Sequence, residues 1–335
     1  MGGRRSGSLD RDEDDFIFSF APFINYRTVG GDWFFSVGGG LNYSEYVNNS
    51  EYSGLGYNGT LGAGYAGGKF NVNTSLNYSF DRGNNRYASY SFVEQHRFSA
   101  AVALGYEISS KTSLDGTFSY NWSEPDGEGI AYNDTDSLRA GMSAMWKATP
   151  LFRIGPGVAY TRSSGDSHIT RETWGPTLTA DYRLGAKISL NAMVGLDFVE
   201  FDGENADSDE TISSNVGLSY RASSLWGMNL SFYRNTYADG YTAGAYREST
   251  GIRAGYNRKI RRATFNAGVG YENSDTSGAT VAGQDWSQDY FNADVSLGMP
   301  FMKRWNGSVF FQWRDESGRY DGDGYRTGVN LTVTF

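Results

Sequence analysis

The residues that could perform catalysis in this sequence are few, and the best arrangement of them lies in one short polar segment. His168 follows Asp166 and Ser167, residue types that a hydrolase can use as acid, nucleophile and base. Three neighbouring residues of one loop do not by themselves form such a site. The other histidine, His96, opens a predicted strand and has no partner at metal-binding spacing. We interpret both histidines as solvated side chains, and we expect no catalytic residue and no enzyme activity.

Acidic residues gather in a second segment, Asp202 to Glu210, which contains five carboxylates. Carboxylate oxygens are suitable ligands for Ca²⁺, but the segment lacks the ligand spacing of a calcium-binding loop. We interpret it as a solvated loop. The chain has no cysteine, which excludes disulfide bonds, thiolate metal sites and cysteine nucleophiles. We therefore expect no bound metal and no cofactor. The net charge of −9 argues against a nucleic-acid partner, because nucleic-acid binding requires a basic surface.

The composition indicates which kind of fold must position any functional residue. The 335 residues include 44 glycines, 24 tyrosines, 21 phenylalanines and 8 tryptophans, which is typical of an all-β protein and not of a helical or α/β enzyme. No run of about 18 consecutive apolar residues occurs, so transmembrane helices are excluded. The mean hydropathy of −0.51 would, on its own, describe a soluble acidic protein.

Apolar and polar residues alternate along most of the chain. From Lys69 to Phe80, side chains such as Phe70 and Leu76 alternate with polar ones such as Asn71. A period of two predicts a β-strand with one apolar and one polar face. The pattern recurs as about seventeen strands, with no helical period or domain linker between them. Further alternating segments cover residues 55–65, 98–106, 113–122, 138–146, 174–182, 188–198, 212–220, 226–232, 265–271, 291–299 and 305–313.

The predicted connections alternate in length. Short turns are expected at positions such as Gly67-Gly68 and Gly185-Ala186, and longer polar loops at segments such as Asp81 to Gln95 and Ser123 to Thr135. Short connections on one side and long ones on the other are typical of up-and-down barrels of the bacterial outer membrane, which have periplasmic turns and extracellular loops.

The number of strands indicates which face points outward. A soluble sandwich buries its apolar faces, but about 16 to 18 strands enclose a lumen that side chains cannot fill. The apolar face must then contact lipid, and the polar face must line an aqueous lumen. Aromatic residues near strand ends, such as Trp33, Trp146 and Trp305, suit interfacial girdles. We predict an all-β fold, a transmembrane antiparallel up-and-down β-barrel of about 16–18 strands in the bacterial outer membrane.

The final segment resembles an outer-membrane assembly signal. Tyr325, Val329, Leu331, Val333 and Phe335 share one face of the predicted last strand, and the sequence ends on the aromatic Phe335. The resemblance implies the barrel assembly machinery as a partner. Outer-membrane lipids and lipopolysaccharide are expected around the barrel.

Three segments carry a likeness to a known family. They are Asp14-Asp15-Phe16-Ile17 with Pro22, Tyr26 and Gly30-Gly31; Leu41-Asn42-Tyr43 to Tyr46; and Gly105 to Thr112. The chain resembles the second β-barrel porin family over its whole length, through turn and girdle features. The resemblance implies an outer-membrane barrel associated with exopolysaccharide or capsule export, periplasmic export proteins as partners, and no catalytic residues.

Strand parity leads to a hypothesis about the N-terminal region. Counted back from Phe335, whose end is periplasmic, the segment from Phe16 to Tyr26 runs from outside to inside, which would place residues 1–15 outside the cell. Bacterial single-chain barrels have an even number of strands, and the family resemblance implies one further strand upstream. We expect residues 1–15 to be a polar segment, the first extracellular loop of an 18-stranded chain, and residues 16–335 to form the barrel. Alternatively, the Phe16 segment lies outside the wall and 16 strands close.

The polar face is where function is expected. Its charged residues are spaced by Asn, Ser, Thr and Gly; an arginine-rich lining favours anionic solutes, and Arg, Asn and Asp can hydrogen-bond sugar hydroxyls. Opposite charges on neighbouring strands would alternatively serve only to stabilise the wall. The candidate pore-lining residues are Arg97, Asp115, Arg139, Arg153, Asp181, Arg183, Asp197, Arg221, Arg253, Asp294, Arg314 and Arg326.

These observations favour a channel or conduit over an enzyme. The expected role is polysaccharide export or the passage of hydrophilic solutes. The alternatives are a general diffusion porin, a structural barrel with a plugged lumen, and a lipid-modifying barrel enzyme. Conductance in a planar bilayer would separate an open channel from a plugged barrel.

Overall fold

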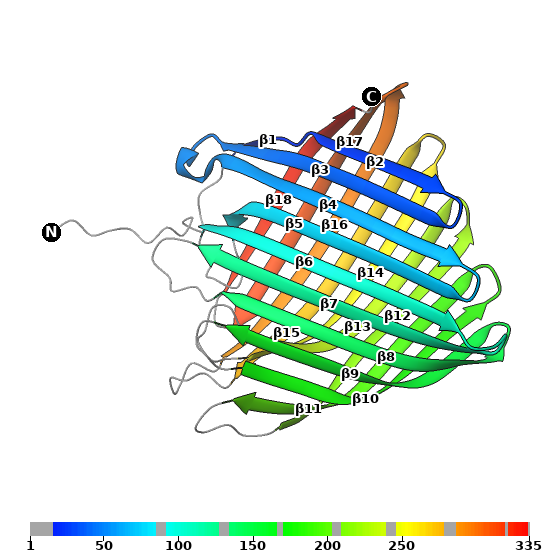
Figure 1. Cartoon of the computed structure of the whole chain (residues 1–335). Coiled ribbons are helices and arrows are strands. Elements are labelled where there is room, and N and C mark those ends of the chain that lie inside the picture. The colour runs from blue at the N-terminus through cyan, green and yellow to red at the C-terminus, as the bar shows by residue number, and fades with distance from the viewer. Residues whose placement is uncertain are drawn as a thin grey trace.

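The computed structural model describes residues 16–84, 92–126, 134–165, 170–202, 209–238, 246–277, 286–318 and 321–333. Within these residues the chain forms one sheet of 18 strands, which curls into a barrel with the first half of the chain in the near wall of Figure 1 and the second half behind it. No helix of the described residues is long and apolar enough to cross a membrane.

The strands are β1 (Ile17–Phe20), β2 (Phe23–Gly30), β3 (Trp33–Tyr46), β4 (Gly54–Gly67), β5 (Phe70–Asn84), β6 (Phe92–Glu107), β7 (Thr112–Asp126), β8 (Thr135–Thr149), β9 (Phe152–Gly165), β10 (Thr170–Leu184), β11 (Ile188–Asp202), β12 (Asp209–Ser223), β13 (Trp226–Ala238), β14 (Tyr246–Ile260), β15 (Ala263–Ser277), β16 (Trp286–Met302), β17 (Trp305–Gly318) and β18 (Gly322–Val333). A 3-10 helix, η1 (Ser50–Tyr52), lies between β3 and β4.

Sheet order follows chain order. From β3 to β18, each strand pairs antiparallel with the next one along the chain. This arrangement confirms the predicted antiparallel up-and-down barrel. We call the end with the short hairpin turns the turn side and the opposite end the loop side.

The strands extend further than the alternation predicts. β5 continues to Asn84 and β7 to Asp126, inside the segments predicted as the loops Asp81 to Gln95 and Ser123 to Thr135. Those loop bounds are therefore wrong at their strand ends. The ladder persists there, for example between Arg82 and Glu94. Both faces of the strand are polar beyond the apolar belt, so the period-two signal disappears although the backbone pairing continues.

The register places apolar residues of neighbouring strands on a common outer face. Leu61 pairs with Leu76, and Leu76 pairs with Ala100, so their side chains point to the same side of the sheet. Leu61 and Leu76 are 45% and 43% exposed, because adjacent strands flank them but nothing covers them from outside. Lipid is the environment that removes such a face from water.

Aromatic side chains form one belt on this outer face near each end of the strands. Pairs with ring centroids 4.7 to 6.2 Å apart on the turn side are Trp33–Tyr65, Tyr220–Trp226 and Phe301–Trp305. Pairs 4.9 to 5.3 Å apart on the loop side are Trp174–Phe198, Phe291–Trp313 and Tyr57–Phe80. Two aromatic belts at the two ends of an apolar band match the interfacial girdles of transmembrane barrels.

Two-residue turns close several hairpins on the turn side. Gly31 and Gly68 have φ angles of 59° and 58° at the first central position of their turns, where both turn types favoured by two-residue hairpins, I′ and II′, require a positive φ. Arg261 occupies the same position between β14 and β15 with φ 56°. A residue with a Cβ atom is strained there, because the left-handed conformation brings Cβ close to the following carbonyl oxygen.

The first two strands occupy one position in the wall. β1 pairs with β3 over Tyr43–Tyr46, and β2 pairs with β3 over Trp33–Gly40. Pro22 separates them, because proline has no N–H to donate to the ladder; its carbonyl still accepts from the Leu41 amide at 3.0 Å. The alternative that the Phe16 segment lies outside the wall is therefore wrong. The 18 described strands fill seventeen wall positions, since β1 and β2 share one.

The edges formed by β2 and β18 differ from the rest of the wall. Within the described residues no ladder of paired residues joins β18 to β1 or β2, although β18 lies beside β2 in the strand order. Both edges run from the loop side to the turn side, so they are parallel to each other. All residues of β2 are exposed, and Val329 in β18 reaches 76%.

Candidate functional site

The twelve predicted pore-lining residues all lie on the face opposite the exposed apolar residues. Residues paired across a ladder share a face, so the register fixes one parity for each strand. Asp115 pairs with Ser143 and Arg139 with Ser119, whereas the neighbouring Leu138 and Met142 belong to the outer face. The same rule places the other ten on this inner face: Arg97, Arg153, Asp181, Arg183, Asp197, Arg221, Arg253, Asp294, Arg314 and Arg326.

Three of these residues meet near the turn side and form what we call the Arg153 cluster. Arg153 Nη2 donates to Asp181 Oδ2 at 2.6 Å, and Arg153 Nη1 lies 3.8 Å from Asp115 Oδ2. The three side chains are 32–39% exposed. One guanidinium thus bridges β7, β9 and β10, and the cluster carries one more negative than positive charge. Its ion pairs contribute about 0–1 kcal/mol each, because water screens them.

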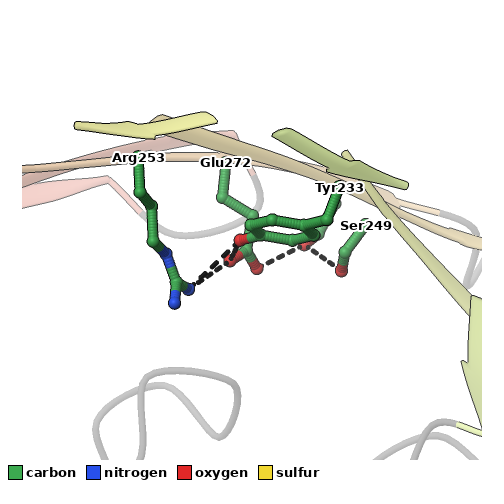
Figure 2. Close-up of polar contacts among 5 residues, drawn as sticks. Tyr233, Ser249, Arg253 and Glu272 are labelled. Atoms are coloured by element: carbon green, nitrogen blue, oxygen red, sulfur yellow. Dashed lines mark hydrogen bonds and ion pairs between the residues drawn. The ribbon is translucent and has the colours of Figure 1, made fainter. Parts of the chain in front are cut away.

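A second group, which we call the Tyr233 cluster, lies on β13, β14 and β15. Figure 2 shows Tyr233, Arg253 and Glu272 converging on one side of the sheet, with Ser249 beside them. The Tyr233 hydroxyl donates to Glu272 Oε2 at 2.6 Å, and Ser274 Oγ donates to Glu272 Oε1 at 3.2 Å. The Glu272 side chain is only 8% exposed. These donors offset the cost of burying its carboxylate.

Arg253 connects this cluster to the lumen. Its Nη2 donates to the Tyr233 hydroxyl at 3.1 Å and lies 3.6 Å from Glu272 Oε2, while the guanidinium carbon sits 5.2 Å from the centre of the Tyr233 ring. The Arg253 side chain is nevertheless 61% exposed. A buried acid and an aromatic ring therefore hold an exposed cation in a defined position.

Sequence reasoning identified Arg253 but missed Tyr233 and Glu272. Both residues occupy inner-face positions of their strands, and the alternation of apolar residues earlier along β13 and β15 could have indicated this. Tyr233 stands between Phe232 and Arg234, so no alternation marks it. Their convergence depends on the register that places Gly251 between them, paired with each.

The remaining predicted residues are spread over the inner face. Arg97 lies 3.7 Å from Asp81, and the Arg326 guanidinium lies 5.8 Å from the centre of the Phe310 ring. Arg183 and Arg221 lie near the turn side, and Asp294 and Arg314 on β16 and β17. They belong to neither cluster.

A pocket lies on the inner face where the wall divides. The ladder between β12 and β13 ends at Ser214 and Arg234, although β12 stays paired with β11 as far as Asp209. Beyond this point the end of β13 contacts β9 on the inner face. A cavity of about 290 Å³ lies there, lined by Asp115, Arg139, Arg171, Thr173, Thr177, Asp181, Met193, Asp197, Ser213, Asn235 and Thr236 among others. Arg171 and Thr173 are 5% and 6% exposed, which shows how closely this part of the inner face is covered.

The described residues form neither a hydrolase-like site nor a calcium site from the histidines and acidic residues considered above. His96 lies on the outer face, 4.6 Å from the Phe80 ring and 2.8 Å from the Tyr78 hydroxyl. His168, with Asp166 and Ser167, lies outside the described residues, as do positions 203–208 of the acidic segment. Within the described part of the chain, no group of three or more His, Cys, Asp or Glu residues is arranged to hold a metal ion.

The residues of the predicted assembly signal lie on the outer face of β18. Tyr325 and Leu331 are 70% and 58% exposed and share this face with Val329 and Val333. Phe335 lies outside the described residues.

No protein-family model and no curated protein matches this sequence. Solved structures do resemble the fold. The FrpB iron transporter of Neisseria meningitidis (F3-3 variant) superposes with a TM-score of 0.55 at 10% identity, over 95% of this chain and 66% of that one. The copper transporter OprC gives 0.54 at 9% identity, over 94% and 63%. The ferric citrate transporter FecA gives 0.54 at 10% identity, over 96% and 62%.

This chain thus spans slightly under two thirds of the length of these structures. At such low identity the likeness concerns the fold, and the polysaccharide-export association of the family that the sequence resembles is not part of it. The similar structures are all bacterial outer-membrane barrels, and the two-faced wall with its aromatic belts has the same requirement for lipid. The chain is a bacterial outer-membrane β-barrel.

Proposed function

We propose that this barrel is a channel that passes hydrophilic solutes through the outer membrane, and that the solute is a polysaccharide. The contrast between the two faces of the wall supports this proposal. The inner face holds charged side chains that remain solvated, such as Arg97 at 55% and Arg253 at 61% exposure, whereas the outer face is apolar. Charged and hydroxyl groups along an aqueous lumen replace part of the hydration of a polar solute as it passes.

The resemblance to the second β-barrel porin family and the hydrogen-bonding capacity of Arg, Asp, Asn and Thr support the choice of a polysaccharide. Under this proposal the chain is not an enzyme, and its partners are periplasmic export proteins, the barrel assembly machinery, lipopolysaccharide and other outer-membrane lipids. The iron, copper and ferric citrate carried by the similar structures define the rival class of cargo.

Two measurements test the proposal. The refolded barrel in a planar bilayer should conduct and, since the predicted lining contains eight arginines and four aspartates, should prefer anions in a salt gradient. Deletion of the gene should stop polymer secretion and leave small-solute uptake unchanged. A conducting barrel whose loss impairs uptake alone would favour a general diffusion porin or the uptake of a metal complex.

A second candidate, a closed structural barrel, is favoured by one observation. The end of β13 contacts β9 across the inner face, which narrows the lumen at that height. A properly folded barrel without measurable conductance would support this candidate and contradict the channel.

A further inference from the structure

The pocket under the end of β13 has a roof made from the opposite face of the sheet. Thr236 and Glu248 have the parity of the outer face, whereas Thr211 and Ser213 have that of the inner face. The folded-in end of β13 therefore lays its outer face over the inner face of the neighbouring strands. The sheet overlaps itself here, and the 290 Å³ cavity lies between the two layers.

Glu248 stabilises the position of this roof through contacts with Thr211 and Arg234. Its Oε2 accepts from Thr211 Oγ1 at 2.9 Å, and its Oε1 lies 2.6 Å from Arg234 Nη2. Thr211 is the ladder partner of Asp197, a pocket residue. A single carboxylate on β14 thus links β12 to the end of β13 directly beside the pocket.

Two charged groups of the pocket remain available for a ligand. Asp115 and Asp181 share Arg153, but neither Asp197 nor Arg139 has a hydrogen-bond or ion-pair partner within the described part of the chain. Asp197 can accept hydrogen bonds, and Arg139 can donate several. Their charges cancel, so the pair does not select for an anionic or a cationic ligand.

The rest of the lining suits a ring with hydroxyl groups on its edge. Thr177 and Thr179 provide hydroxyls that can donate or accept, together with methyl groups, and Met193 provides apolar surface. A sugar ring has hydroxyls around its edge and C–H groups on its faces. The cavity lies near the lower limit, about 300 Å³, of ordinary ligand pockets, which is enough for one small ring and not for a large complex.

We infer that this pocket binds one ring of a neutral hydroxylated solute, a sugar unit, with Asp197 accepting from a hydroxyl group and Arg139 donating to a ring or hydroxyl oxygen. The inference rests on the proposed function and adds a subsite to it. It places the sugar-binding position on one wall of the lumen, under the end of β13.

Calorimetry on the detergent-solubilised full chain tests the subsite without requiring conductance. Maltohexaose is the probe, and polyethylene glycol of similar size, which lacks hydroxyl groups along its chain, is the size control. Asp197→Asn should weaken maltohexaose binding about tenfold, the usual effect of losing one hydrogen bond to a charged group. Asp275→Asn makes the same charge change on the outer face of β15 and should leave binding unchanged. Heat-modified migration on a gel confirms that each variant is folded.

The outcomes separate the two proposals. Maltohexaose binding that is equal in Asp197→Asn and the parent, equal binding of polyethylene glycol, or the absence of maltohexaose binding would each overturn the subsite. Conductance in a bilayer, measured separately, decides the channel. A folded chain that binds maltohexaose through Asp197 but does not conduct would retain the subsite and overturn the channel.

Discussion

The ladders on the two sides of the β13–β14 pair differ in completeness. β14 and β15 pair at fifteen consecutive positions, from Tyr246 with Ser277 to Ile260 with Ala263. β12 and β13 stop pairing at Ser214 and Arg234. The complete ladder carries the Tyr233 cluster, in which the register brings a tyrosine, an arginine and a glutamate together. The incomplete ladder creates the pocket, because the end of β13, which stays paired with β14 but no longer with β12, folds over the inner face. A regular wall therefore positions paired charges, and its interruption provides space for a ligand.

The largest expected effect comes from adding a methyl group to β10, one of the strands that line the pocket. A Cβ atom on Gly175, on the inner face of β10, would lie 1.8 Å from the Leu196 carbonyl oxygen. Gly175→Ala must move the backbone and should destabilise the barrel by about 3 kcal/mol or more. Urea unfolding in detergent measures this, with Gly59→Ala as the control because nothing lies within 4 Å of its added Cβ. Equal stability of both variants would contradict close packing at β10 and β11.

The next effect concerns the Tyr233 cluster on β13, β14 and β15. Tyr233→Phe removes the hydroxyl that donates to the buried Glu272 carboxylate at 2.6 Å. We expect a loss of about 1.5–3 kcal/mol in the same unfolding assay, because a buried charged acceptor loses a donor. Tyr26→Phe is the matched control, since Tyr26 lies on the outer face of exposed β2 and has no hydrogen-bond partner among the described residues. If Tyr233→Phe is neutral, water replaces the hydroxyl and the cluster is more open than the contacts indicate.

Releasing the roof should have a more local effect. Glu248→Gln weakens the link to Arg234 and the hydrogen bond from Thr211. Amide hydrogen exchange at Asn235 to Ala238 should become about tenfold faster, corresponding to roughly 1.4 kcal/mol of local stability. Exchange in the β14–β15 ladder should not change. Faster exchange in both regions would mean that Glu248 stabilises the whole wall and not the roof alone.

The smallest expected effect is at the turn of the complete ladder. Arg261→Gly removes a Cβ atom from a residue with φ 56°. Relief of the left-handed strain exceeds the added flexibility of the unfolded chain, so the barrel should gain about 0.5–1 kcal/mol. Refolding titrations in detergent measure the gain. A loss of stability would show that the arginine side chain contributes more than its backbone conformation costs.

Much of the wall could be predicted from local pattern. Segments such as Phe70 to Phe80 alternate strictly, and the parity that they define places Arg97, Arg139 and Arg253 on the inner face. The pattern stops after Phe80 and after Trp122, where both faces become polar, whereas the strands continue to Asn84 and Asp126. Pattern also could not show that Pro22 divides the first wall position between two strands. These features depend on backbone pairing, which an alternating pattern does not record.

The class of the protein follows from the alternating pattern alone, because a strand presents successive side chains to opposite faces and an apolar face on a barrel of this size must contact lipid. The same pattern shows which charged residues share the inner face. The pairing of strands in three dimensions was needed to show that Arg153 joins Asp181 and Asp115, that Tyr233 and Glu272 hold Arg253, and that β13 separates from β12 beyond Arg234. Those contacts depend on the register between strands, which shifts every cross-strand distance when it changes and which no single segment specifies.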